Sequence, residues 1–365
     1  MKVLCYRVNN IEDYKKLLKK DKQKKRCFLF VFLFLFLVFA FFSLFFGSSS
    51  LSFKDSFFGL FGKGESTAIR IRQKIRLPRV LAGTICGIGL ALSGLIRQTC
   101  LDNPRASPST LGVSNAAVLG ANVAIIILSK GRVHTDNNNA WNSFNPFAVS
   151  SIAFLFALGS IFLILALAKI QRFSPETLVL AGVCLSSLFT AITTLLQYFA
   201  TDTELSSAVY WSFGDLGRAG YREILIRTVM VLVSYFVFTL FRSHLNARTL
   251  GEEEALATGV NTEFVRFLLL SFASLRIACS ISFLGVIGFI GLICPHIARK
   301  LFSSDHSYLL PSTSLFGAFL LLFADDLARI LLKGFSLPVG AITPILGTPF
   351  FLILLFRYER RKKHA

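Results

Sequence analysis

Long apolar stretches alternate with short polar segments along almost the whole chain. Each stretch has about 20 residues, the length that an α-helix needs to cross ~30 Å of hydrocarbon. This pattern predicts an all-α polytopic membrane protein with ten membrane-spanning helices. They lie near residues 28–46, 80–97, 111–128, 147–168, 177–199, 222–241, 264–283, 285–301, 309–331 and 340–356.

The first stretch, 28–46, has two readings. It carries no charge and follows a basic head, and small residues (47–50) come after it, a pattern that is also typical of a signal peptide. Its apolar run exceeds the usual ~7–15 residues of a signal peptide. We therefore favour an uncleaved first span.

Composition excludes the other broad classes of protein. Hydrophobic residues make up 54% of the chain and charged residues 16%, which is too little charge to cover a soluble core. A disordered chain would be poor in apolar residues.

The net charge of +19 is concentrated in three places. Residues 1–26 carry +7, residues 357–365 carry +4 and residues 63–79 carry +5. Short basic segments stay in the cytoplasm, so we predict a multi-pass protein of the cell (inner) membrane with both termini cytoplasmic. The predicted domains are a basic tail (1–27), a ten-helix domain (28–356) and a second basic tail (357–365).

No segment outside the membrane is large enough to read a nucleic-acid groove, so we expect no nucleic-acid partner.

The cluster at 63–79 breaks this rule, because alternate threading places it outside. Either a span is miscounted, or the positive charge has a function on the external face. The most direct such function is to bind an acidic partner. Threading also places 200–221 outside, and the pattern from Thr201 to Gly220 suggests a short surface helix.

The sequence holds no motif for catalysis. The nearest approach to a P-loop, Gly62–Gly64, lacks both its spacing and its hydroxyl, so the chain cannot bind ATP in that manner. No zinc-protease, Cys-x-x-Cys or nucleophile-elbow pattern occurs, and the five histidines are scattered. We predict a non-enzyme with no catalytic residues, no metal site and no cofactor.

Two motifs lie near the second and third spans. Arg76-Leu77-Pro78-Arg79 places two arginines at the external rim, where they either anchor the helix at the interface or meet a partner. The segment 103–115 has two prolines and many polar groups in an apolar region. Such a segment lines a translocation pathway or forms an ordinary cytoplasmic turn.

Two further motifs lie in the second half. The segment 250–260 is an internal loop whose short helix is bounded by glycines, either a docking handle or a solvated connector. The segments 288–299 and 337–351 flank Ala324–Arg329, in which Asp325 and Arg329 are spaced to pair on one helix face.

In this order, these motifs resemble the FecCD family, the membrane permeases of bacterial ABC importers for iron–siderophores, haem and vitamin B12. The similarity covers about residues 70–357. It implies a type II ABC importer permease that pairs with a second copy or a paralogue. It also implies two cytoplasmic ATPase subunits and an external solute-binding protein that delivers the ligand.

The resemblance also implies site residues. Arginines at the positions of Arg76, Arg79 and Arg329 would form salt bridges with glutamates of the binding protein, which would explain the external cluster. The coupling helix that meets the ATPase corresponds to 250–260, with Gly251, Glu252, Glu253, Ala255 and Gly259.

The chain departs from the family pattern at Arg105, Arg276 and the additional Asp326, which puts the pore surface and the substrate in doubt. The mechanism implied is alternating access, for which we expect a pore wall from the second and fifth spans. An ion-driven secondary transporter is the alternative, but it needs acidic pairs near the midplane of several spans.

Overall fold

The computed structural model describes residues 11–45, 69–103, 112–128, 146–170, 175–257, 259, 261–331 and 336–362. Within these ranges the regular structure is helical, apart from one isolated backbone bridge between Phe213 and Val286. The predicted all-α membrane architecture is confirmed. Most of the predicted motif at 103–115 and the loop 129–146 lie outside the described residues.

Helices coincide with all ten predicted spans. Among the described residues, seven helical segments are long and apolar enough to cross a membrane, and two shorter ones cover 113–127 and 339–353. The helices are α1 (Ile11–Ser43), η1 (Ile71–Arg76), α4 (Leu77–Cys100), α5 (Val113–Asn122), η3 (Val123–Ile127), α6 (Pro146–Ile170), α7 (Pro175–Tyr198), α8 (Asp202–Ser212), η5 (Leu216–Arg218), α9 (Tyr221–Leu240), α10 (Arg242–Arg248), α11 (Glu252–Leu256), α12 (Thr262–Leu284), α13 (Ile290–Leu301), α14 (His306–Ile330) and α15 (Val339–Lys362).

The segment predicted as the eighth span is broken at its start. Gly285 adopts φ 78°, a conformation that favours glycine, and α12 ends there. Residues 285–289 then run without helix, and α13 begins only at Ile290. Its 12 residues reach about 18 Å, which is shorter than the hydrocarbon layer.

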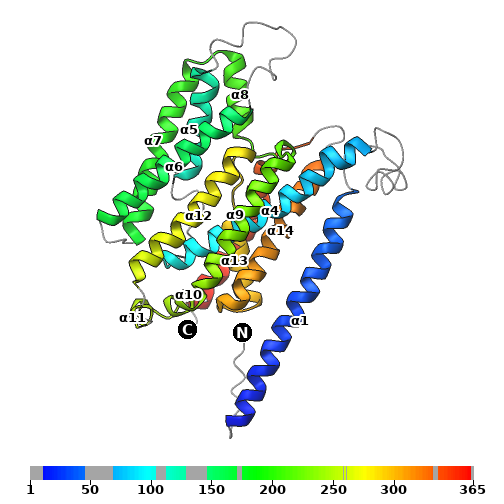
Figure 1. Ribbon diagram of the computed structural model, residues 1–365, viewed down its shortest axis with the longest axis vertical. Helices are drawn as coiled ribbons and strands as arrows, with labels where there is room; N and C mark the ends of the chain where they lie inside the picture. Colours follow the sequence, from blue (N-terminus) through cyan, green and yellow to red (C-terminus); the bar gives the residue numbers. More distant parts are fainter. Residues whose placement is uncertain are drawn as a thin grey trace.

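The second span, α4, occupies the centre of the bundle (Figure 1). It packs against α14, α12, α13 and α9, and 78% of the residues in its most apolar 18-residue stretch are buried. Helices of the same chain cover most of the second span, so only a small part of its surface can contribute to the predicted pore wall.

Close backbone contacts explain the glycines of α4. A Cβ on Gly87 would lie 2.2 Å from the carbonyl oxygen of Gly317 in α14. A Cβ on Gly94 would lie 1.8 Å from the carbonyl oxygen of Gly291 in α13. Small residues at these crossings let the helix axes approach closely, as is common in membrane helices.

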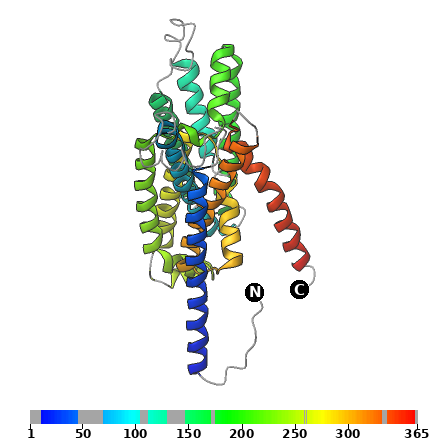
Figure 2. The ribbon, with the colours of Figure 1, turned by 90° about the vertical axis from the view of Figure 1, so that its right-hand side faces the viewer.

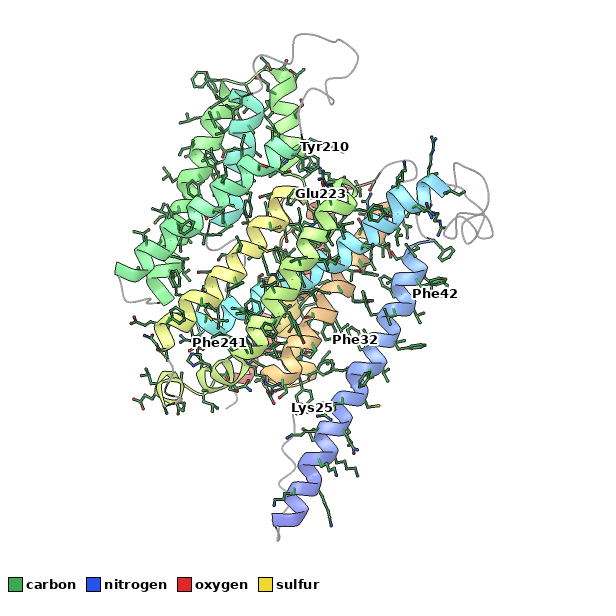
Figure 3. The ribbon with its side chains drawn as sticks, viewed as in Figure 1. Lys25, Phe32, Phe42, Tyr210, Glu223 and Phe241 are labelled. Carbon is green, nitrogen blue, oxygen red and sulfur yellow. The ribbon has the colours of Figure 1, made fainter. Side chains whose placement is uncertain are left out.

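The first helix, α1, lies on the outside of the bundle against α14 (Figure 1). Phenylalanines join the two helices: Phe32 stacks on Phe316 with centroids 4.6 Å apart, and Phe39 lies 5.1 Å from Phe319. Figure 3 shows Phe32 on the side of α1 that faces the bundle. The Phe-rich first span is therefore part of the membrane domain.

The two ends of the helical domain lie at the same end of the bundle. Figure 2 shows that α1 starts and α15 ends there, which is the arrangement expected for the predicted even number of spans. At the opposite end lies α8, which confirms the predicted short surface helix. A capping box begins α8: the Thr201 hydroxyl accepts from the Glu204 amide, and the Glu204 carboxylate accepts from the Thr201 amide.

We predict that Gly94→Ala prevents stable folding. The added methyl group would overlap backbone atoms of Gly291, which cannot move without displacing α13. We expect a loss of about 3 kcal/mol or more of stability, measured as folded yield and thermal unfolding of the purified protein.

Gly159→Ala in α6 is the matched control, because its Cβ would meet nothing within 4 Å. It should leave stability unchanged or raise it by up to about 1 kcal/mol. Equal behaviour of the two variants would contradict the close packing of α4 and α13.

Candidate functional site

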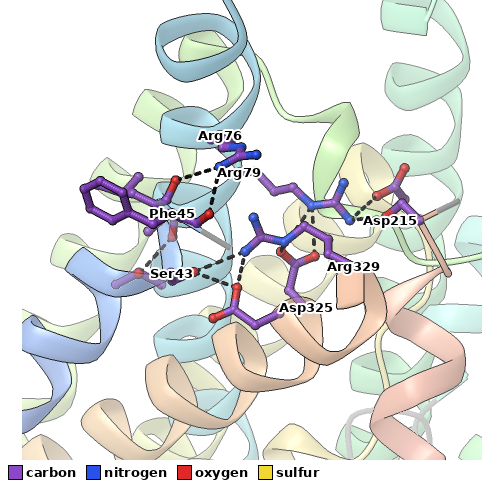
Figure 4. A network of polar contacts seen from close by, with 12 residues as sticks. Ser43, Phe45, Arg76, Arg79, Asp215, Asp325 and Arg329 are labelled. Carbon is purple, nitrogen blue, oxygen red and sulfur yellow. Dashed lines mark hydrogen bonds and ion pairs between the residues drawn. The ribbon is translucent and has the colours of Figure 1, made fainter. Parts of the chain in front are cut away.

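The three predicted docking arginines come together at one end of the bundle (Figure 4). Arg76 ends the π-helical turn η1, Arg79 lies in the first turn of α4, and Arg329 lies in the last turn of α14. The helix is continuous through this region, and Pro78 sits in the first turn of α4. The three side chains are 5%, 8% and 6% exposed.

A buried carboxylate, Asp325, joins two of these arginines. The Nε atom of Arg79 donates to both of its oxygens, at 2.9 and 3.1 Å. The Nε atom of Arg329 lies 3.1 Å from Oδ2 of the same group, which confirms the predicted pair on α14. Asp325 has no exposed surface, so its charge depends on these two guanidinium groups.

The additional acid, Asp326, connects α14 to the end of α1. Its Oδ1 atom accepts from the Ser43 hydroxyl at 2.7 Å and is paired with Arg329. Arg329 also donates to the Ser43 oxygen, at 3.1 Å. Asp326 therefore supplies a second negative charge and a polar contact for the first span.

Arg76 contacts the same end of α1. It donates to the backbone carbonyl oxygens of Leu44 and Phe45, at 3.2 and 3.0 Å. Leu44 and Phe45 directly follow α1, and carbonyl groups at this end of a helix have no amide donor within the helix. Arg72, on the preceding turn, stacks over the Phe45 ring at 4.4 Å. The basic cluster therefore caps the first span.

The outward edge of Arg79 has further polar neighbours. Its terminal nitrogen lies 3.4 Å from the half-exposed Asp215 and donates to the Ser336 hydroxyl at 2.9 Å. Asp215 also accepts from the Gly217 amide at 2.9 Å, which fixes the loop before α9. Arg79 therefore has three polar partners within the chain, Asp325, Asp215 and Ser336.

The predicted coupling segment forms a short helix, α11, at the opposite end of the bundle. Gly251 and Gly259 flank it with φ of 156° and 72°, and Ala255 is fully buried. Glu253 and Leu256 are exposed. The side chain of Glu252 lies outside the described residues. The segment therefore has one anchored face and one exposed face.

Hydrogen bonds connect α10, which precedes this segment, to α14 and α4. The Asn246 amide donates to Asp305 at 2.9 Å, and the His306 amide donates to Asn246 at 2.8 Å. Arg248 donates to the carbonyl oxygen of Thr99, at 3.3 Å. In α10, burial and the cations Arg248 and Arg266 lower the pKa of His244, so its side chain is neutral at pH 7.

The same two helices carry the arginine cluster at their other ends. Thr99 and His306 are in contact at 3.2 Å, whereas Arg79 and Asp325 pair at the far end. The α4–α14 pair is thus antiparallel and joined at both ends, and it spans the distance between the coupling segment and the arginines.

A polar stripe follows the exposed fifth span, α7. Asn115 of α5 donates to Thr190 at 3.1 Å, and Gln197 donates to Asn122 at 3.0 Å. Only 17% of the residues in the most apolar window of α7 are buried, so most of this helix faces outward from the protomer.

The unusual Arg276 of α12 is buried beside α4. Its terminal nitrogen lies 3.4 Å from the carbonyl oxygen of Ile88 and packs against Gly89. Within the described part of the chain, no group of three or more His, Cys, Asp or Glu side chains could hold a metal ion.

Comparison with known proteins gives a consistent result. The model of the FecCD transport family matches residues 35–357. An ABC transporter permease protein of Methanocaldococcus jannaschii is 43% identical over 320 residues, which cover 88% of this chain and 91% of the relative. The hemin transport system permease protein HmuU of Yersinia pestis is 34% identical over 326 residues, which cover 87% of this chain and 91% of the relative. Relatives named for vitamin B12 and molybdate import also match.

A solved structure has the same architecture. It is described as an inward-facing conformation of a metal-chelate type ABC transporter. It shares 30% identity with this chain at a TM-score of 0.75, and the match covers 91% of this chain and 99% of that one.

We predict that Asp325→Asn destabilises the protein by about 3–5 kcal/mol, because it leaves two buried arginines without their shared counter-charge. Thermal unfolding in detergent measures the change. Asp202→Asn, at an exposed position in α8, should cost less than about 1 kcal/mol. Equal costs would show that the buried pairing carries no stability.

Proposed function

Because the chain belongs to the FecCD transport family, we propose that it is the permease subunit of a binding-protein-dependent importer for an iron chelate. The chelate would be a ferric siderophore, haem or a cobalamin-like ligand, carried across the cell (inner) membrane. The family and its relatives are ABC importer permeases, and transport without enzymatic activity in this subunit agrees with that class.

The α4–α14 pair is the observation that carries this proposal. A hydrogen bond joins Asn246 at one end to His306 at the start of α14, so movement around Asn246 would be transmitted to α14. The other end of α14 carries Asp325, which holds Arg79. An ATPase on one side of the membrane can drive transport of a ligand delivered on the other side only if the two sides are mechanically connected. Packed helices that can adopt two discrete arrangements provide such a connection.

Alternating access follows from this connection. ATP binding would draw two cytoplasmic ATPase subunits together and move the coupling segments, Gly251 to Gly259, of two permease subunits. The α4–α14 pairs would then tilt and open the cavity between the subunits toward the binding protein. Hydrolysis would reverse the tilt, and the ligand would leave toward the cytoplasm.

Exposed surfaces support the proposed partners. In the coupling segment, the exposed Glu253 and Leu256 would contact the ATPase, while the buried Ala255 holds the helix to its own chain. The exposed face of α7, with Ser187 and Thr194, would line the cavity shared with a second permease copy or paralogue. Both termini would lie in the cytoplasm, as their basic charge indicates.

Arg76, Arg79 and Arg329 would bind acidic residues of the external binding protein. Asp325 and Asp326 already neutralise part of their charge. A docking glutamate would therefore approach the outer edge of Arg79, where Asp215 lies at the longer distance of 3.4 Å. Internal pairing would keep the arginines oriented before the partner arrives, which lowers the ordering cost of docking.

Two of the matches support a metal chelate as substrate, although another relative is named for molybdate import. Hemin is named for the Yersinia pestis relative, and the solved structure is described as metal-chelate type. The ion-driven alternative requires titratable acids within the spans. Asp325 and Asp326 lie together near one end of α14 and pair with arginines there, which is not the set of acids near the midplane of several spans that this alternative needs.

Uptake into proteoliposomes tests the function. The permease would be reconstituted with its ATPase and binding protein, and a labelled ferric siderophore, hemin or cobalamin would be supplied. We expect uptake of one of these that requires ATP hydrolysis. Uptake that persists without ATP while an ion gradient is maintained would overturn the proposal in favour of a secondary transporter.

Docking is tested with a charge-balanced pair of substitutions, Arg79→Gln with Asp325→Asn. Removing both charges leaves Arg329 paired with Asp326, so the fold should survive. We expect the affinity for the binding protein to fall about tenfold or more, measured by surface binding to the permease in nanodiscs.

Arg222→Gln removes one exposed charge at the same end of the bundle and serves as the control. It should change the affinity little. Unchanged binding in the double variant, with normal thermal unfolding, would contradict the docking role of Arg79.

The coupling segment is tested by Glu253→Lys. The side chain is exposed, so folding should be unaffected, while the reversed charge should weaken the contact with the ATPase. We expect ATP-dependent uptake to fall about five- to tenfold. Glu263→Lys, an exposed acid in the first turn of α12, is the matched control and should retain uptake. Equal uptake by both variants would contradict the assignment.

A further inference from the structure

A groove of about 590 Å³ lies between α1 and α14, in the half of the bundle where α1 begins. Leu29, Phe30 and Leu33 line it from α1, and Pro311 and Leu315 line it from α14. The spacing of the three α1 residues places them on one face of the helix, and the same holds for the two on α14. The groove therefore has two apolar walls.

The packing of α1 explains why protein does not fill this groove. A neighbouring face of α1 carries Phe28 and Phe32, whose rings contact Phe302 at 5.0 Å and Phe316 at 4.6 Å. These contacts hold the two helices together along one edge. Phe30 remains 70% exposed on the other face, so the groove opens toward the membrane.

The polar end of the groove is basic. Arg26 precedes the apolar run of α1, and Arg242 is the first residue of α10. Both side chains are exposed. Ser307 and Tyr308, in the first turn of α14, complete this end.

The neighbouring charges leave both arginines available. Lys25 is engaged with Asp21 at 2.6 Å and lies over the ring of Tyr308. Asp305, which caps α14, accepts hydrogen bonds from Asn246 and from the amide of Ser307. Within the described ranges, neither Arg26 nor Arg242 pairs with these or other carboxylates.

We propose that this groove binds an anionic glycerophospholipid. Its phosphate would lie between Arg26 and Arg242, and an acyl chain would run along Leu33 and Leu315. From Arg26 to Leu33 the helix rises about 10 Å, which fits within the ~15 Å depth of one leaflet. Two cations at the boundary and an apolar trough below them match this ligand, whereas a soluble anion would make no use of the trough.

The proposed orientation places this lipid in the cytoplasmic leaflet, but the binding itself does not depend on that orientation. The bound lipid would bridge α1 and α14 at the end opposite the Ser43–Asp326 contact. It would thereby fix the first span at both of its ends.

Lipid binding to the purified full-length protein tests the proposal. Dioleoylphosphatidylglycerol and dioleoylphosphatidylcholine would be titrated in detergent, and bound lipid counted by native mass spectrometry. We expect a preference for phosphatidylglycerol that falls about fivefold for each arginine replaced, because one basic residue at the surface contributes about that much. Arg26→Gln with Arg242→Gln should remove the preference.

Two further variants make the outcome specific. Lys22→Gln with Arg222→Gln removes the same charge from exposed sites outside the groove and should keep the preference. Leu33→Trp fills the apolar trough without changing charge and should reduce binding of phosphatidylglycerol. An unchanged preference in the Arg26/Arg242 variant, equal binding of both lipids to the unmodified protein, or competition by inorganic phosphate alone would overturn the proposal.

Discussion

The contact between α4 and α14 determines how the rest of the bundle is arranged. Gly87 and Gly317 bring their backbones so close that no side chain fits between them. Membrane helices gain no hydrophobic free energy from leaving lipid for protein, so such tight van der Waals packing must hold them together. The contact also aligns the ends of both helices, which pairs Arg79 with Asp325 at one end and Thr99 with His306 at the other.

The arginine cluster is neutralised within the chain. Charge inside a membrane protein must be neutralised, because an isolated buried ion costs several kcal/mol. Asp325 and Asp326 meet this requirement for Arg79 and Arg329. The proposed docking role would also need charge that a partner can reach, and Arg79 meets the half-exposed Asp215 at the longer distance of 3.4 Å. The end of α1 joins this network through Ser43, so the first span and the arginines stabilise one another.

Local and long-range features differ in how far the sequence predicts them. The ten apolar segments, the surface helix after Thr201 and the pair between Asp325 and Arg329 follow from length, capping and helical spacing. The pairing of Arg79 with Asp325 joins residues 246 positions apart and depends on which helices pack together. The start of α13 at Ile290, five residues after the predicted start of the eighth span, does not follow from the sequence for a related reason. Hydropathy does not reveal that the backbone of Val286 is hydrogen-bonded to Ser212, in a distant part of the chain.

The contact between Ser43 and Asp326 joins residues 283 positions apart, which has a consequence for biogenesis. At about 5–20 residues per second, a ribosome needs roughly 15 to 60 s between synthesising the two residues. During that interval α1 is already made, while its partner α14 is not. Because the exposed phenylalanines of α1 favour lipid, α1 can remain in the bilayer until the last sixth of the chain, which contains α14, has been synthesised.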